Sequence, residues 1–268
     1  MAETGPDRTD RTERIGQTER AGRRPLWPAL VCLLLVLLGV AWVAGRQSMV
    51  GAPDRPARLD AVRLGPDPGA SVAGYLAGLP ARWPAPGAPA VPALVQFDAP
   101  LDGAAAARLL AEVAPAGGVA PVGGAAPVTA VFRVPLPRVQ TALRFQPLPT
   151  VDAADPVAGV ERRFALAQRA AERDASAQAG RLSGRAASVA RYEVAALATP
   201  CRCVLAVLVI GDRAELTRLA ETQRVRAVDA APEGTPTTGV ALAPLLPEQT
   251  EVAGPVPDDG PVPAPATS

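Results

Sequence analysis

The chain has 268 residues, of which 49% are apolar, and its 27 basic and 26 acidic side chains give a net charge of +1. It contains no histidine and no lysine, which excludes a Ser-His-Asp triad, imidazole metal ligands, Schiff-base chemistry and a P-loop lysine. The small net charge excludes the long-range positive field of nucleic-acid-binding proteins, and the bias towards Ala, Pro, Gly and Arg is typical of a high-GC bacterium.

An uncharged stretch at 26–45 contains seven leucines and four valines. A helix rises 1.5 Å per residue, so these 20 residues reach about 30 Å, the thickness of a bilayer core. Trp27 and Trp42 lie near its two ends, where indole rings favour the headgroup region. The pattern predicts a single transmembrane helix.

More arginines lie close before this stretch than close after it, and the more basic flank usually stays in the cytoplasm. We therefore expect residues 1–25 to be a disordered cytoplasmic tail and residues 46–268 to be extracytoplasmic, behind an uncleaved signal anchor in the cell (plasma) membrane. A cleaved signal peptide is the alternative, although the polar leader and the apolar run are both long for one.

Two proline-rich regions bound the predicted domain. Residues 46–92 read as a linker with one short helix after Ser71, and residues 232–268 hold nine prolines and no aromatic residue, which predicts a disordered tail. Residues 93–231 remain to build one extracytoplasmic α/β domain.

Two stretches of this domain follow the same strand–helix–strand pattern. In the first, a strand at 93–97 precedes a helix capped by Asp102 and a strand at 129–136. In the second, a strong apolar strand at 203–210 precedes a helix whose Asp212 and Glu215 have capping-box spacing, followed by a strand at 225–228. Two βαβ units predict an α+β fold, a ferredoxin-like sandwich with one sheet and helices on one face.

A long helical segment at 157–199 separates the two units. Its apolar stripe is clear as far as Ala175, and Gly180 and Gly184 are the expected breaks, because an unbroken helix would be longer than the domain is wide. We predict an inserted helical hairpin. A coiled-coil partner surface is the alternative, but an Ala-rich stripe lacks the Leu/Ile seam of coiled coils.

Cys201 and Cys203 are the candidate disulfide. Oxidising compartments favour such bonds, yet residues two apart on a strand have Cα atoms about 6.6 Å apart, at the upper edge of disulfide geometry, so a local bend is required. The alternatives are two free thiols, or a redox or metal centre, for which further soft ligands are lacking.

Three other charged patterns have simple structural interpretations. The arginines of 157–199 suggest either lipid contact or a solvated helix surface. Arg138 and Arg144 suggest either the flanks of a peptide groove or a strand leading into a packed loop. The acidic pairs Asp152/Asp155 and Asp258/Asp259 lack the buried setting of catalytic carboxylates. We expect no catalytic, cofactor-binding or metal-binding residues.

The layout resembles the uncharacterised single-pass envelope proteins of actinobacteria. The residues that carry this resemblance are Arg23-Arg24 before the anchor, Pro200-Cys201-Arg202-Cys203-Val204, Val225-Arg226-Ala227-Val228-Asp229 and Leu246-Pro247-Glu248-Gln249-Thr250. The resemblance implies a location and no activity. The layout is also similar to bitopic cell-division proteins with a POTRA domain, although the spacer and the strand order differ.

These patterns together predict a bitopic membrane protein that is not an enzyme. We expect its extracytoplasmic domain to act as an envelope interaction, scaffold or sensor module with a protein partner, no cofactor, no nucleic acid and no small-molecule substrate. The alternatives are a division or envelope assembly protein of the POTRA-bearing type, and a thiol-disulfide redox protein using Cys201 and Cys203.

Overall fold

The computed structural model describes residues 61–112, 125–152 and 155–264. The mixed α+β prediction is confirmed within these ranges, which contain two sheets and five α-helices. No helix in the described ranges is long and apolar enough to cross a membrane. The tail predicted at 1–25 and the transmembrane helix predicted at 26–45 lie outside the described residues.

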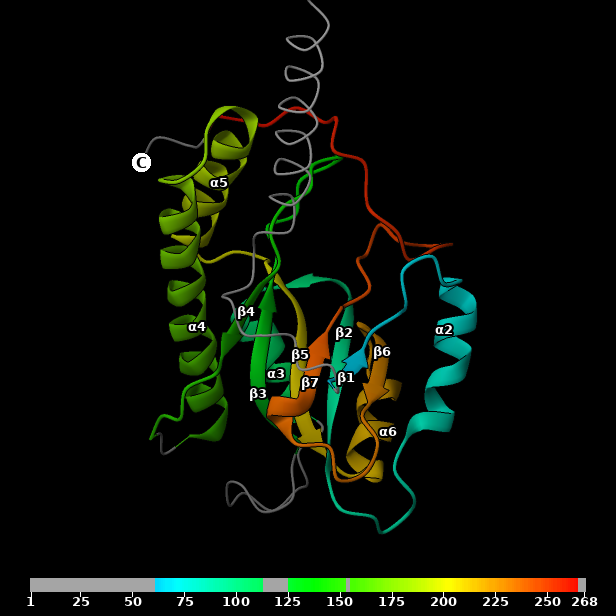
Figure 1. Cartoon of the computed structure of the whole chain (residues 1–268). Coiled ribbons are helices and arrows are strands. Elements are labelled where there is room, and N and C mark those ends of the chain that lie inside the picture. Colours follow the sequence, from blue (N-terminus) through cyan, green and yellow to red (C-terminus); the bar gives the residue numbers. More distant parts are fainter. Residues whose placement is uncertain (1–60, 113–124, 153–154, 265–268) are drawn as a thin grey trace, which may run out of the picture. The chain divides into compact units, whose positions relative to one another are not determined.

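Five strands form the main sheet, in the order β4-β3-β5-β2-β6 (Figure 1). They are β2 (Val91–Leu101), β3 (Ala126–Phe132), β4 (Arg144–Pro147), β5 (Val204–Gly211) and β6 (Val225–Ala230). All neighbouring strands are antiparallel. The two strands of each βαβ unit are therefore parallel to each other, with one strand of the other unit between them, so both units share one sheet.

The central strand β5 is an almost uninterrupted apolar run. Seven of its eight residues are buried, because both faces of the sheet are covered at its centre. Val95 of β2 aligns with Val207 of β5 on one side and with Val228 of β6 on the other. Strands buried on both faces are expected to be continuously apolar rather than alternating.

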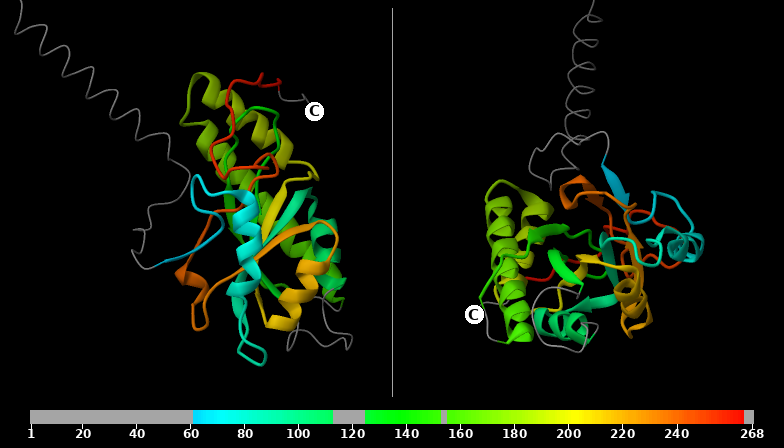
Figure 2. Two further views of the ribbon diagram at one scale, coloured as in Figure 1. Left: turned by 90° about the vertical axis from the view of Figure 1, so that its right-hand side faces the viewer. Right: turned by 90° about the horizontal axis from the view of Figure 1, so that it is seen from below.

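Helices α3 (Gly103–Glu112), α4 (Pro156–Ala179) and α6 (Arg213–Glu221) share one core with the first face of the sheet (Figure 2). Asp102 accepts a hydrogen bond from Ala105 N at 2.7 Å at the start of α3. The predicted capping box of Asp212 and Glu215 is present at the start of α6. Local sequence signals thus set where these helices begin.

The predicted helical hairpin is present as α4 followed by α5 (Gly184–Leu197), with the break at 180–183. Phe164, Ala167, Ala171 and Ala175 are buried along one stripe of α4. Leu182 lies in the turn after α4 and is exposed, so the apolar stripe ends at Ala175. Small alanine side chains let α4 pack closely against its neighbours.

The second face of the sheet is covered by described segments that lie before and after the predicted bounds of 93–231. Strands β1 (Val62–Leu64) and β7 (Val240–Leu242) pair in parallel and pack over Leu94 and Leu208 (Figure 1). Helix α2 (Val72–Gly78), which begins after its N-cap Ser71, belongs to the same segments. So do the 3-10 helices η1 (Leu79–Arg82) and η2 (Thr237–Gly239).

The described part of the predicted tail, 232–264, is therefore seated on the domain rather than detached. Leu245 is fully buried, and Ala253 is buried beside α2. The physical reason is that α3, α4 and α6 cover only the first face of this sheet, so the apolar side chains of the other face require cover from elsewhere. The sequence pattern did not predict these contacts, because the segment is rich in proline and has no aromatic residue.

Candidate functional site

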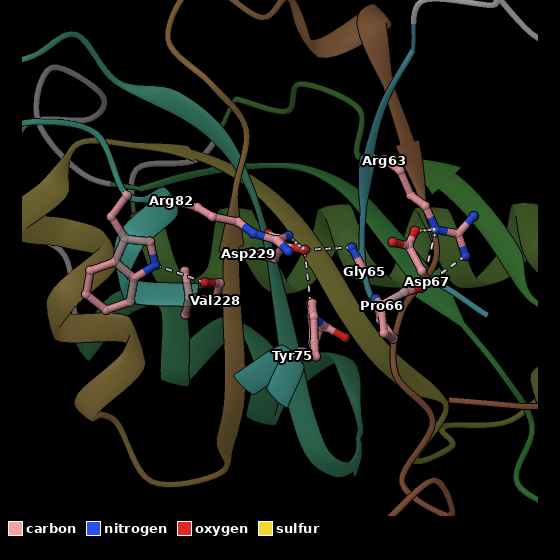
Figure 3. A network of polar contacts seen from close by, with 10 residues as sticks. Arg63, Gly65, Pro66, Asp67, Tyr75, Arg82, Val228 and Asp229 are labelled. Carbon is pink, nitrogen blue, oxygen red and sulfur yellow. Dashed lines mark hydrogen bonds and ion pairs between the residues drawn. The ribbon is translucent and has the colours of Figure 1, made fainter. Parts of the chain in front are cut away.

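A buried polar network on β6 joins the segment 65–82 to the sheet (Figure 3). The Asp229 carboxylate has 0% exposure and accepts hydrogen bonds from Gly65 N at 2.7 Å and from the Tyr75 hydroxyl at 3.0 Å. The half-exposed Arg82 guanidinium donates to the same carboxylate at 3.2 Å. One carboxylate thus fixes β1, α2 and η1 at three points.

Gln96 on β2 extends the network to the C-terminal segment. Its Nε2 donates to the Tyr75 hydroxyl oxygen at 2.7 Å, and its Oε1 accepts from Leu245 N at 2.6 Å. Gln96 and Asp229 are both fully buried in the sheet, and buried polar groups are tolerated only when they are hydrogen-bonded. Tyr75 therefore bridges Gln96 of β2 and Asp229 of β6.

The electrostatics of the network keep Tyr75 protonated. Burial, followed by the charge of Asp229, raises the pKa of Tyr75. Burial also raises the pKa of Asp229, while its hydrogen bonds from Gly65, Tyr75 and Arg82 oppose that rise. The Arg82 guanidinium lies 5.8 Å from the centroid of the Tyr75 ring, within the range of a cation–π contact.

This geometry suits a structural role better than a catalytic one. The buried Asp229 carboxylate is occupied by three donors, which leaves no face for a substrate. Gly65 has a φ of +124°, and a Cβ there would overlap the carbonyl oxygen of Ala243. Sequence reasoning missed the network, although Gln96 inside the predicted strand 93–97 was an available signal.

Two motifs that carried the family resemblance contact each other. Arg226, from 225–229, donates to the carbonyl oxygens of Leu246 and Gln249 at 3.0 and 2.6 Å. Glu248 accepts from the buried Arg133 of the segment after β3 at 2.8 Å. The contacts of these two motifs therefore hold the C-terminal segment against the sheet.

The structure joins Cys201 and Cys203 in a disulfide, with Cα atoms 5.3 Å apart. That separation is shorter than the roughly 6.6 Å of an extended pair, because the chain bends at Arg202 before β5 begins. Cys203 is buried, and the half-buried Cys201 packs against the helix-side core. One sulfur is therefore shielded from solvent.

Arg138 and Arg144 do not flank an open groove. Arg144 of β4 is buried and forms an ion pair with Glu193 of α5, which also accepts from Ala142 N at 2.7 Å. Arg138 pairs with Asp259. The polar Gln178, near the C-terminal end of α4, accepts from Arg144 at 2.8 Å. The structure thus favours the packed-loop interpretation of this region.

Several of the remaining charged candidates have partners within the chain. Asp155 caps α4, accepting from Val157 N at 2.8 Å. Arg163 donates to carbonyl oxygens at 127, 148 and 149, which anchors α4 beside β3. Such partners support the interpretation of 157–199 as an ordinary helical surface. Among the described residues, no group of three or more Cys, Asp or Glu side chains could hold a metal ion.

A cleft of about 580 Å³ lies between α3 and the turn from α6 to β6. Arg224 in this turn has a φ of +77°, an uncommon conformation for a residue with a Cβ, and its Nε donates to Asp98 at 2.8 Å. The cleft is lined by one acidic, two basic, two uncharged polar and three apolar side chains. They are Leu101, Ala105, Arg108, Leu109, Glu112, Thr222, Gln223 and Arg224.

Comparisons with protein-family models, with curated proteins and with solved structures found no match.

Proposed function

We propose that the chain is a bitopic protein of the cell membrane, with a cytoplasmic N-terminus, whose extracytoplasmic domain binds a protein partner as an envelope scaffold, assembly or sensor module. The uncharged stretch 26–45 and the arginines before it support the anchor and its orientation. The Cys201–Cys203 disulfide supports an oxidising compartment for the domain.

We also assign the domain to the ferredoxin-like arrangement. The order β3-β5-β2-β6, with each helix α3 and α6 crossing over one intervening strand, supports this assignment. Strand β4 is added at one edge, and the α4–α5 hairpin is inserted between β4 and β5. The fold by itself carries no activity.

The observation that supports a binding role is that the buried ionisable groups have structural roles, whereas the cleft holds accessible side chains. Asp229 and Glu193 each hold separate segments of the chain together, and neither faces the cleft. The cleft offers accessible side chains of mixed polarity on a rigid sheet and helix. Recognition of a partner requires no more than such a surface.

Site-specific photocrosslinking in native membranes tests this role. A photoreactive residue at the exposed Gln223 in the cleft should yield a crosslinked partner, whereas one at the exposed Arg173 of α4 should not. Crosslinks of equal yield from both positions would contradict recognition at the cleft. No crosslink, together with a reductase activity that Cys201→Ser abolishes, would favour the thiol-disulfide alternative.

A further inference from the structure

The segment 256–260 near the C-terminal end of the described chain is bound along the loop that follows β3 (Figure 1). Gly260 N donates to the Arg138 carbonyl oxygen at 2.7 Å. In the opposite direction, Gln140 donates from its backbone N to Asp258 at 3.0 Å and from Nε2 to the Val256 carbonyl oxygen at 2.8 Å. The loop thus forms hydrogen bonds with both backbone and side-chain groups of the segment.

Two arginines recognise the two acidic side chains. Arg138 contacts both carboxylate oxygens of Asp259, with Nε at 2.8 Å from Oδ1, in the bidentate geometry that gives arginine its specificity. Arg185, in the first turn of α5, lies 3.2 Å from Asp258. We call residues 136–141 together with Arg185 the tail-binding surface.

The shape of this surface is specific for glycine at the third position. Gly260 is buried, and a Cβ there would overlap the Pro137 carbonyl oxygen and lie 2.8 Å from that of Arg138. Arg138 itself has a φ of +55°, a conformation that costs free energy in a residue with a Cβ. The loop is therefore held in an unusual conformation at the point where the segment docks.

The segment is nevertheless weakly retained. Arg138 and Asp259 are 61% and 63% exposed, and the Arg185–Asp258 pair is also exposed, so both ion pairs are screened by water and salt. Residues 256–259 bury no apolar side chain, in contrast to Leu245 further back in the chain. Segments with few buried apolar contacts open at low free-energy cost.

We propose that the tail-binding surface is a docking site for a partner peptide that contains two acidic residues followed by glycine, and that the chain's own segment 256–260 is its displaceable occupant. This inference goes beyond the recognition proposed at the cleft: it assigns a second docking site on another surface and names the chemistry of its partner. The bound segment defines what the surface recognises. The motif is two consecutive acidic residues followed by a glycine, whose backbone N–H donates and which has no Cβ. The tether makes the occupant a competitor that only a matching peptide displaces.

Fluorescence anisotropy on the purified full-length chain in detergent tests the proposal. The probe is a labelled peptide with the sequence of residues 255–264. The release variant Asp258→Asn/Asp259→Asn should bind it at least about tenfold more tightly than the wild-type chain, because the tethered competitor is weakened. Added salt should reduce this binding.

Matched variants separate recognition from general charge effects. Adding Arg138→Ala to the release variant should abolish peptide binding, whereas Arg63→Ala, which removes a remote exposed pair with Asp67, should not. A peptide with alanine in place of Gly260 should fail to bind. Gly260→Ala in the chain is a second release variant that keeps both carboxylates, and protection of the β5 amides from hydrogen exchange reports folding in each case.

Three results would overturn the proposal: no binding to either folded release variant, equal binding to the wild-type chain, or dimerisation of the wild-type chain through exchanged C-terminal segments. None of these bears on the crosslinks from Gln223. Failure of the docking site and failure of the proposed interaction role are thus distinguishable.

Discussion

Tyr75 is the residue on which the second face of the sheet depends most directly. Its hydroxyl donates to Asp229 and accepts from Gln96, so it connects β6, β2 and α2 through one atom. Buried polar groups of this kind stabilise a fold only while every member is paired. Small changes at this position should therefore have measurable effects on stability.

Removing the hydroxyl with Tyr75→Phe should lower the free energy of unfolding by about 1–3 kcal/mol, because Asp229 loses a donor and Gln96 loses an acceptor in a buried setting. Tyr192→Phe is the control, since Tyr192 takes no part in the network. Urea denaturation of both variants measures the difference. Equal losses in the two variants would mean that the hydroxyl of Tyr75 contributes nothing specific.

The raised pKa of Tyr75 has a defined consequence for alkaline stability. The native state holds this proton more tightly than the unfolded chain, whose tyrosine pKa is about 10. The stability it contributes is fully present below that pH and is lost as pH rises towards the native pKa. In a Tyr192→Phe chain, which retains only Tyr75, tyrosinate absorbance should appear only together with unfolding. Ionisation of Tyr75 in a chain with native circular dichroism would refute this expectation.

Among the elements, the α4–α5 hairpin is the best example of a local pattern completed by a distant contact. Its glycine break follows from sequence, but its position against β4 is fixed by the buried Arg144–Glu193 ion pair and by Gln178. Both charges of that pair are nearly inaccessible to water. Each charge therefore depends on the other.

Glu193→Ala should destabilise the chain by about 3–5 kcal/mol, because Arg144 is then left charged and unpaired in the interior. The double change Arg144→Met/Glu193→Leu should recover most of this loss. Glu172→Ala, on a half-buried position of α4, is the control. Thermal and urea unfolding provide the measurement, and a double variant as unstable as the single one would contradict an ionic origin.

For the whole described domain, the decisive feature is that segments from both sides of the two βαβ units close one face of the sheet. Strands β1 and β7 are paired although they lie far apart in sequence. The same segments are tied to the sheet through Asp229 and Gln96. Stability of the domain should therefore depend on residues that sequence analysis placed in linkers.

Gly65→Ala tests this dependence. The positive φ and the overlap with the Ala243 carbonyl oxygen should cost at least about 3 kcal/mol and expose the second face of the sheet. Gly78→Ala, at a helical φ with open space around its Cα, should be neutral or slightly stabilising. Unfolding curves and binding of a hydrophobic dye distinguish the two variants. An unperturbed Gly65→Ala chain would show that the terminal segments are dispensable.

The redox state of Cys201 and Cys203 indicates the compartment of the domain. In a Cys32→Ser chain isolated from native membranes, Cys201 and Cys203 should resist alkylation until a reductant is added. Cys203 should still react slowly after reduction, because it is buried. Two thiols that react without reductant, but only slowly, would exclude both the disulfide and the redox alternative.

Local patterns predicted much of the fold but little of its polar network. The β5 run, the Asp212–Glu215 capping box and the break after α4 each depend on neighbours a few residues away, so the sequence revealed them. Strand β4 escaped notice because it is short and its pairing with β3 decides its conformation. The Asp229–Gly65 contact joins residues 164 positions apart, which no spacing rule detects.

The sequence alone determined the α+β class, the two βαβ units and the inserted hairpin, because propensity, capping and periodicity act over one or two turns of chain. Only the tertiary structure decided how the units interleave and that 61–83 and 232–264 belong to the domain. It also decided that the acidic pair Asp258-Asp259 occupies the tail-binding surface. The physical reason is that burial of the second sheet face and pairing of its charges are properties of distant residues brought together, and a linear pattern does not encode that proximity.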